Sequence, residues 1–272
     1  MTAALPLRCG STTVGAYVTA PRLAARLSPR PYLHPLATLA GAPVTELMPA
    51  DHAHHLGAGL AVPDVAGHNF WGGRTFVPGR GPTELDNHGE QRHLRWTARR
   101  PDGFTEELSW TAGGSELLHE ERTVTVRQLN LQAWELDFSF TLTNTTGAAL
   151  RIGSPATNGR PGAGYGGFFW RAPHTGTPPR VFTPGAVGED AVHGSTADWL
   201  ALAGEHWTLV LRGADPWFVR TREYPGVGSA LAWRSPLTVP AGGSVARRVV
   251  TAVADGRLGP DEAAELAART TR

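Results

Sequence analysis

Most of the chain consists of short runs in which apolar and polar residues alternate, separated at close intervals by turn residues. This pattern is typical of antiparallel sheet, because successive side chains of a strand point to opposite faces. In the clearest run, 129–142, the alternation changes phase near Trp134 and Glu135, which predicts a β-bulge. Further strands are predicted at 12–19, 32–39, 44–48, 94–99, 106–112, 117–126, 149–153, 199–202, 206–212, 229–233 and 244–253.

One stretch near the end of the chain, 259–269, is expected to be helical, because Pro260 suits a first helical position and acidic residues follow it. Helices do not alternate with strands elsewhere, which argues against a parallel βαβ sheet. We therefore predict an all-β protein, a large two-sheet antiparallel β-sandwich with a short C-terminal helix, forming one domain over residues 1–272. The irregular segment 153–167 is interpreted as a loop within that domain.

Composition narrows the classes of function. The 272 residues carry a formal net charge of +1, every basic residue is Arg, and no basic stripe is visible, so no nucleic-acid partner is predicted. The single cysteine, Cys9, excludes an internal disulfide and fits a reducing compartment. The N-terminus lacks a leader-like apolar stretch, and no window approaches the ~18 apolar residues of a membrane span. We expect a cytoplasmic protein with no membrane partner.

The densest group of chemically versatile side chains lies between residues 51 and 71 and contains Asp51, His52, His54, His55, His68, Asn69 and Trp71. In an extended segment His52 and His54 would share a face and His55 would point away. These imidazoles could pack as structural residues, transfer protons or contact a substrate, or bind a divalent metal. A metal would need a third ligand, for which the candidates are His68, Asp51, Glu46, Glu84, Asp86, Asn87, His88, Glu90 and His93.

A second group, from Asn87 to His93, precedes the predicted strand around Trp96. In one interpretation the segment is only a tight turn. In the other, His88 projects into the cleft that contains His54, and Glu90 orients an imidazole by accepting its second N–H.

A third group, from Tyr165 to Arg171, follows the glycine-rich loop. Aromatic faces stack on the C–H faces of sugars and arginine hydrogen-bonds hydroxyls, so this mixture suits a carbohydrate cleft. Alternation requires at least Phe168 or Trp170 to face the core. A weaker group of the same kind contains Trp217, Arg220, Glu223 and Tyr224, and the carboxylates available for glycosidase chemistry are Glu84, Glu90, Glu205 and Glu223.

Two resemblances add to these observations. The order Arg30, Pro31, Tyr32, His34, Pro35, Gly41, Val44, Thr45, Asp51, His52, His54, His55, Gly57, Gly67, Asn69, Phe70 and Trp71, with a later Gly164–Arg171 stretch, resembles a family of soluble bacterial proteins named "methane oxygenase PmoA" over roughly residues 30–235. That name implies copper-dependent alkane oxidation, but the membrane enzyme it evokes is built on transmembrane helices, which this chain lacks.

More distantly, His88, Gly89 and Trp96, then Asn144 and Thr145, then the aromatic loop resemble the galactose mutarotase-like fold. That resemblance implies a large two-sheet sandwich that binds sugars in a cleft lined by histidines and carboxylates. It would place a histidine near 158–165, where this sequence has none, which argues against ring-opening epimerisation while leaving sugar binding open.

We therefore predict a protein that acts on or binds a small carbohydrate without a cofactor, a divalent metal being the open alternative. The predicted acid and base groups are His54, His55, His88 and Glu90. The predicted substrate-binding residues are Arg30, Asp51, His52, Asn69, Trp71, Tyr165, Trp170 and Arg171. A metal-dependent oxidoreductase and a non-catalytic sugar-binding module are the two other hypotheses.

Overall fold

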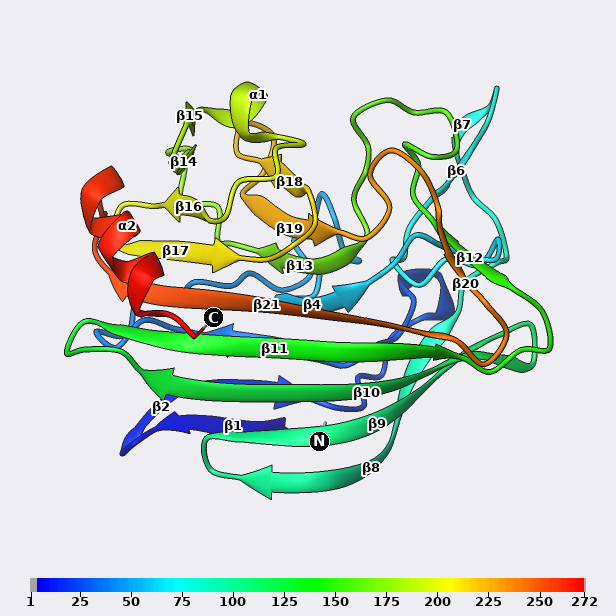
Figure 1. The fold of residues 1–272 in the computed structure, drawn as a ribbon, viewed down its shortest axis with the longest axis horizontal. Coiled ribbons are helices and arrows are strands. Elements are labelled where there is room, and N and C mark those ends of the chain that lie inside the picture. The colour runs from blue at the N-terminus through cyan, green and yellow to red at the C-terminus, as the bar shows by residue number, and fades with distance from the viewer. Residues whose placement is uncertain (1–3, 272) are drawn as a thin grey trace.

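The computed structural model describes residues 4–271, so residues 1–3 and 272 of the predicted domain lie outside the described part. Within it, two large antiparallel sheets pack face to face (Figure 1). The nine-stranded sheet has the order β15-β14-β16-β17-β21-β11-β10-β9-β8 and the seven-stranded sheet the order β1-β2-β3-β4-β13-β19-β18. The predicted fold class, an all-β two-sheet sandwich, is confirmed, whereas the prediction of one domain stays a prediction.

The elements have the following bounds. The nine-stranded sheet contains β8 (Glu90–Arg100), β9 (Gly103–Ala112), β10 (Ser115–Gln128), β11 (Ala133–Asn144), β14 (Arg180–Thr183), β15 (Ala186–Val187), β16 (Leu200–Ala203), β17 (Trp207–Arg212) and β21 (Ser244–Asp255). The seven-stranded sheet contains β1 (Ala4–Cys9), β2 (Thr12–Val18), β3 (Tyr32–Leu36), β4 (Ala58–Ala61), β13 (Gly167–Arg171), β18 (Trp217–Arg220) and β19 (Gly226–Ala230). Smaller elements are β5 (Asp64–Val65), β6 (Thr75–Val77), β7 (Gly81–Thr83), β12 (Leu150–Gly153), β20 (Leu237–Val239), α1 (Glu189–Val192), α2 (Pro260–Arg269) and the 3-10 turn Ala25–Leu27.

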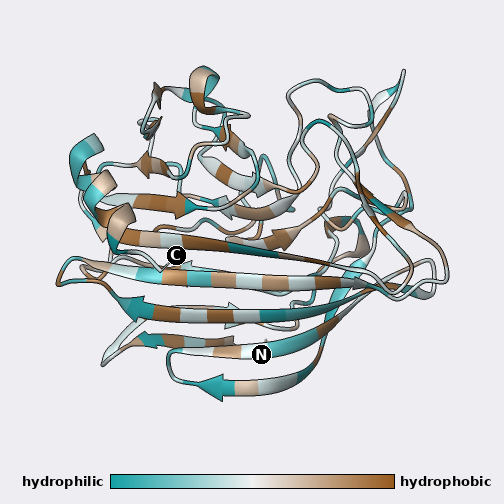
Figure 2. Ribbon diagram, in the orientation of Figure 1, coloured by the Kyte–Doolittle hydropathy of each residue, from teal (hydrophilic) through white to brown (hydrophobic). Residues whose placement is uncertain are grey.

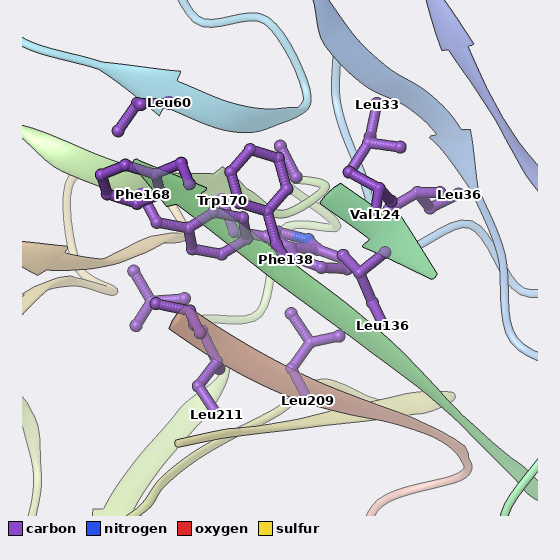
Figure 3. Close-up of a cluster of buried hydrophobic side chains, with 14 of the residues drawn as sticks. Leu33, Leu36, Leu60, Val124, Leu136, Phe138, Phe168, Trp170, Leu209 and Leu211 are labelled. Atoms are coloured by element: carbon purple, nitrogen blue, oxygen red, sulfur yellow. The ribbon is translucent and has the colours of Figure 1, made fainter. Parts of the chain in front are cut away.

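The core lies between the two large sheets. Phe138 of β11 meets Phe168 of β13 with ring centroids 5.0 Å apart, and leucines of β3, β4 and β17 surround them (Figure 3). The alternating bands along β10 and β11 in Figure 2 reflect this arrangement, because one face of each strand is buried in the core.

The predicted β-bulge near Trp134 is wrong. Strand β11 begins only at Ala133, and its register with β10 and β21 runs without a shift. Leu131, which set the first phase of the alternation, lies in the β10–β11 turn with 90% of its surface exposed. The phase change therefore marks the start of a strand.

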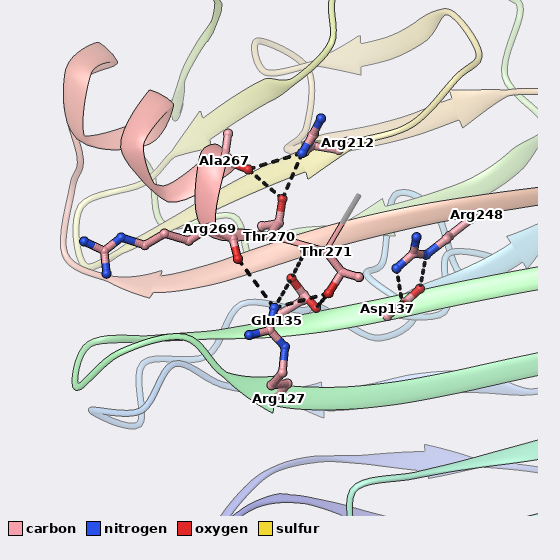
Figure 4. A network of polar contacts seen from close by, with 9 residues as sticks. All are labelled: Arg127, Glu135, Asp137, Arg212, Arg248, Ala267, Arg269, Thr270 and Thr271. Atoms are coloured by element: carbon pink, nitrogen blue, oxygen red, sulfur yellow. Dashed lines mark hydrogen bonds and ion pairs between the residues drawn. The ribbon is translucent and has the colours of Figure 1, made fainter.

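The predicted C-terminal helix is confirmed as α2. Helix α2 begins after Gly259, whose N–H donates to the Glu262 carboxylate at 2.7 Å, and it buries Ala263 and Leu266. Thr271, which follows the helix, is tied to the nine-stranded sheet, because its hydroxyl and its N–H both donate to Glu135 of β11. Arg127 also reaches that carboxylate (Figure 4).

Several strands differ from their predictions. Residues 44–48 do not form a strand but belong to the loop between β3 and β4. Within that loop, Leu47 pairs with Leu56 in an isolated bridge. Strands β1, β4, β13 and β18 were not predicted. None of the helices among residues 4–271 is long and apolar enough to cross a bilayer. The cytoplasmic location stays a prediction.

Candidate functional site

The floor of the candidate site is the face of the seven-stranded sheet that points away from the core. In β13, Phe168 and Trp170 belong to the core, so Phe169 between them projects from the opposite face. The same alternation in β18 places Phe218 on that outer face. Phe169 packs against Trp71, with ring centroids 4.9 Å apart, and together these side chains form a small aromatic cluster separate from the core.

The histidines lie on the loop between β3 and β4, which is folded back on itself by two turns. The His52 N–H donates to the Pro49 carbonyl at 3.0 Å, and the His55 N–H donates to the His52 carbonyl at 2.8 Å. The second turn places His52 and His55 together, with stacked rings whose centroids are 4.6 Å apart. The expectation that His55 would point away therefore fails, because it assumed an extended backbone where the chain turns.

All three imidazoles of this loop are in contact. His54 packs edge-on against His55 with centroids 4.7 Å apart and lies 5.7 Å from His52. The Tyr224 ring closes the group, at 4.7 Å from His52 and 5.2 Å from His55.

Arg171, at the end of β13, connects the loop to the sheet from below. Its guanidinium is 2% exposed, donates to Glu46 at 2.9 Å and lies 3.7 Å from Asp51. It also approaches Nδ1 of His55 at 3.4 Å. Because a guanidinium can only donate, that contact requires a lone pair on Nδ1, so neutral His55 carries its hydrogen on Nε2.

His52 has the opposite tautomer. Its Nδ1 lies 2.8 Å from Oδ2 of Asp51, and a carboxylate accepts, so Nδ1 carries the hydrogen and Nε2 of the neutral ring keeps a lone pair. Burial opposes the charge of Asp51, but the hydrogen bond from His52 and the charge of Arg171 together lower the pKa of Asp51. An ionised carboxylate beside Nδ1 both orients the ring and stabilises the imidazolium that forms when Nε2 takes a proton.

The other two imidazoles are held neutral. Burial, with the nearby charge of Arg30, lowers the pKa of His54 to about 3. Burial, with the neighbouring His54 and His52, lowers the pKa of His55 far below its ordinary value. At neutral pH these two rings can donate or accept hydrogen bonds but carry no charge.

Two predicted substrate-binding residues support the loops from inside. Buried Arg30 donates to the His54 carbonyl at 2.7 Å and to two carbonyls of its own turn. Buried Asn69 accepts from the N–H groups of Trp71 and Gly72 at 2.8 and 2.9 Å. Glycine is required at 73, where φ is +70° and a Cβ would lie 2.9 Å from Nδ1 of His54.

These elements enclose a cleft of about 500 Å³, a volume within the usual range for small-molecule sites. Six predicted site residues line the cleft. Asp51, His52, His54 and Tyr165 are partly exposed, whereas His55 and Trp71 are buried in its wall. The remaining side chains that line it are Arg74, Pro82, Glu84, Arg160, Ala163, Phe218, Arg220, Glu223 and Tyr224.

Four other predicted residues, His88, Glu90, Trp170 and Arg171, do not line this cleft. His88 and Glu90 line a different cavity of about 410 Å³ beside residues 111–114, and Nε2 of His88 bonds the Gly73 carbonyl at 2.8 Å. Trp170 is fully buried and donates to the Val44 carbonyl. Arg171 contacts the cleft residues from behind without lining the cleft.

The metal-ligand candidates are dispersed. Nδ1 of His93 contacts Glu106 at 2.6 Å, while His68 lies against Gly113. Within residues 4–271, no group of three or more His, Cys, Asp or Glu side chains is placed to hold a metal ion.

Some lining residues were not among the predicted site residues. Arg220, Glu223 and Tyr224 stood in the weaker aromatic group, but Phe218 and Arg160 were not singled out. The alternation Trp217, Phe218, Val219, Arg220 carried a usable signal, because it places Phe218 and Arg220 on one face of a strand. Nothing in the sequence around Arg160 indicates its place in the cleft.

Together these features define an all-β sandwich protein with a histidine-bearing cleft on the outer face of its seven-stranded sheet. The chain belongs to the family of unknown function DUF6807, whose match covers residues 4–268. The methane-oxygenase resemblance has no support from that match and stays a prediction. A search of curated proteins finds no match.

Solved structures are similar in fold. A candidate aldose 1-epimerase from Escherichia coli K12 superposes with a TM-score of 0.50 at 11% identity, covering 93% of this chain and 99% of that one. This likeness agrees with the galactose mutarotase-like fold expected from the sequence. A heparan sulfate lyase from Pedobacter heparinus gives a TM-score of 0.38 at 12% identity, covering 90% of this chain but 34% of the lyase.

Proposed function

We propose that this protein is carbohydrate-active: it binds a sugar or sugar derivative in the cleft and moves a proton through the Asp51–His52 pair. The observation that carries the proposal is the 2.8 Å contact between Asp51 and His52 at the edge of a cleft with an aromatic floor. The fold shared with a candidate aldose 1-epimerase supports a sugar as the substrate class.

The aromatic side chains suit the apolar face of a sugar ring. Trp71 and Tyr165 pack together with centroids 4.8 Å apart, and Tyr165 also contacts Phe218 at 5.6 Å. Tyr165 is half-buried and lines the cleft. A pyranose can lay its C–H face on such a surface while its hydroxyls meet the polar groups around the rim.

His52 is the proposed proton-transfer residue. Nε2 of neutral His52 can accept a proton from a sugar hydroxyl or an activated C–H, and Asp51 stabilises the resulting imidazolium. Glu84 and Glu223 also line the cleft and are the available partners for a second proton transfer, whereas Glu90 and Glu205 do not line it. Neutral His54 and His55 fix the position of the His52 ring and offer hydrogen bonds without competing for the proton.

The proposal is tested with a panel of free aldoses, uronates and simple glycosides, followed by NMR for both binding and turnover. Wild-type protein should bind at least one member and convert it, and His52→Ala should lower turnover of that member by at least about 100-fold. His206→Ala is the matched control, because His206 is 77% exposed beside Glu205 and lies outside the cleft.

Two results contradict the proposal in different ways. Turnover that survives His52→Ala would remove the proton-transfer role. Saturable binding without turnover in the wild-type protein would instead support the non-catalytic sugar-binding module.

A further inference from the structure

The cleft has one wall that is rich in positive charge. Arg160 and Arg220 both line it, on the side that carries Tyr165 and Phe218. The charges of both guanidiniums act on the Tyr165 hydroxyl, which places this hydroxyl within electrostatic reach of each of them. The wall therefore consists of two cations with a phenol beside them.

The charge of Arg160 is not cancelled by the group it contacts. Its partner is the Tyr165 hydroxyl, which is neutral, because burial raises the pKa of Tyr165 above its ordinary value. Arg160 is also exposed, so its remaining N–H groups are accessible to a bound molecule.

Arg220 is held in place mainly by an aromatic ring and a backbone carbonyl. Its guanidinium lies over the Phe218 ring, 4.7 Å from the centroid, and donates to the Val219 carbonyl at 2.8 Å. The nearest carboxylate in contact is Glu189, at 4.0 Å.

That carboxylate has closer partners than Arg220. Glu189 accepts from the Thr221 N–H at 2.7 Å and from the Thr221 hydroxyl at 3.0 Å, and Arg222 approaches it to 3.6 Å. Its charge is therefore shared with donors of the two residues that follow β18, and it neutralises Arg220 only in part.

Arg74, the third arginine that lines the cleft, has a close carboxylate partner. Arg74 pairs with Glu84 at 3.1 Å, and both side chains are more than 60% exposed, at 64% and 69%. The arginine charges on the Tyr165 side thus have looser carboxylate contacts than Arg74 has, although Glu223 also lines the cleft, whereas Asp51 is paired with His52.

We propose that the cleft selects an anionic sugar, with its carboxylate or phosphate bound by Arg160, Arg220 and the Tyr165 hydroxyl. This inference rests on the proposed function, and it adds the substrate class. A guanidinium donates two parallel hydrogen bonds to a planar carboxylate or to a phosphate, so two arginines beside a phenol match such a group in both charge and geometry. The anion would anchor one end of the sugar and leave the rest of the ring over the aromatic floor near His52.

The test compares D-glucose, D-glucuronate, D-glucose 6-phosphate and inorganic phosphate by titration calorimetry at one fixed ionic strength. The protein should bind glucuronate or glucose 6-phosphate at least about 10-fold more tightly than glucose, because hydrogen bonds to charged groups are the stronger ones. The two anionic sugars distinguish a carboxylate site from a phosphate site.

Variants of Arg160 and Arg220 test whether these two residues cause the preference for anionic sugars. Arg160→Gln and Arg220→Gln should each lower the ratio of anionic-sugar affinity to glucose affinity by about 10-fold. Arg95→Gln is the matched control, because it removes one exposed, paired arginine of β8 outside the cleft. The preference should also fall as salt rises from 0.05 to 0.5 M.

Failure of this inference is distinct from failure of the proposed function. Glucose binding as tight as that of both anionic sugars, with both variants like wild type, overturns the anionic selectivity and leaves the proposed function standing. Inorganic phosphate binding as tightly as glucose 6-phosphate would also overturn it, because the site would then recognise an ion alone. Absence of binding by every sugar, anionic or neutral, overturns both.

Discussion

Two groups of polar side chains in this molecule contrast sharply in their surroundings. One lies between the two large sheets, where Arg122 of β10 donates to Glu120 at 2.7 Å and to Tyr17 at 2.7 Å, and Tyr17 in turn contacts Glu106. The other is the cleft, where Asp51 and His52 stand at the surface. The first group is carried by strands and fully buried, whereas the second is carried by a loop and half-exposed.

The contrast shows that density of polar residues does not by itself identify a site. In the buried group each charge has a partner: the Trp110 N–H also donates to Glu120, and the charges of Glu120 and Glu106 outweigh burial and raise the pKa of Arg122. The side chains of Arg122, Glu120 and Glu106 have no exposed surface. In the cleft, Nε2 of neutral His52 keeps a lone pair and Arg160 bonds the neutral Tyr165 hydroxyl, so both side chains leave bonding capacity for another molecule.

The largest effect is expected from Arg122→Met, which removes the buried guanidinium from beside the buried carboxylates of Glu120 and Glu106. We expect a loss of about 3–5 kcal/mol in the free energy of unfolding, measured by urea titration. The double variant Arg122→Met with Glu120→Gln should recover part of this loss, because it removes one of these buried charges. A loss below about 1 kcal/mol for the single variant would show that the buried charges do not depend on Arg122.

An intermediate effect is expected from the depressed pKa of His54. A histidine that is neutral in the folded protein and titrates near 6.5 when unfolded makes the protein less stable as pH falls from about 6.5 towards the folded pKa of about 3. Between pH 7 and pH 5 this costs about 2 kcal/mol for His54.

Replacement of His54 by Gln should therefore flatten the decline in unfolding free energy between pH 7 and pH 5, in urea titrations at the two values. His206→Gln serves as the control for loss of an exposed imidazole. An unchanged pH slope in the His54 variant would mean that this ring is not held neutral by burial.

The smallest effect is expected at the rim of the cleft. Arg74 and Glu84 form the same kind of ion pair as Arg122 and Glu120, at 3.1 against 2.7 Å, but in solvent. Glu84→Gln should change the unfolding free energy by less than about 1 kcal/mol, because water already solvates both charges. A loss comparable with that of Arg122→Met would erase the distinction between the two environments.

The sequence predicted the sandwich but not all of its strands. Long strands such as β10 and β11 were found because one face is buried and the other is not, which produces alternation. Strand β13 was missed, because Phe168, Phe169 and Trp170 are all buried, two in the core and one under the cleft loops. A strand with both faces covered has no alternating pattern to read.

The candidate site was predictable where it is local and not where it depends on distant segments. His52, His54 and His55 lie on one loop, so their proximity follows from the sequence. Their pairing did not follow, because it depends on the turn at His52 and on Arg171 from another strand. His88 was placed by its bond to the Gly73 carbonyl, a contact that no spacing in the sequence encodes.

The most direct test of the central claim, that the cleft around the Asp51–His52 pair binds a sugar, is an NMR titration of histidine-labelled protein. The eleven imidazoles are followed through their Cε1–Hε1 signals while D-glucose, D-glucuronate or D-glucose 6-phosphate is added, with His52 assigned through His52→Ala. The proposed site predicts saturable shifts for His52 and its neighbours His54 and His55, with His206 and His119 unmoved. Saturable shifts confined to histidines outside the cleft, or none for any of the three sugars, would contradict it.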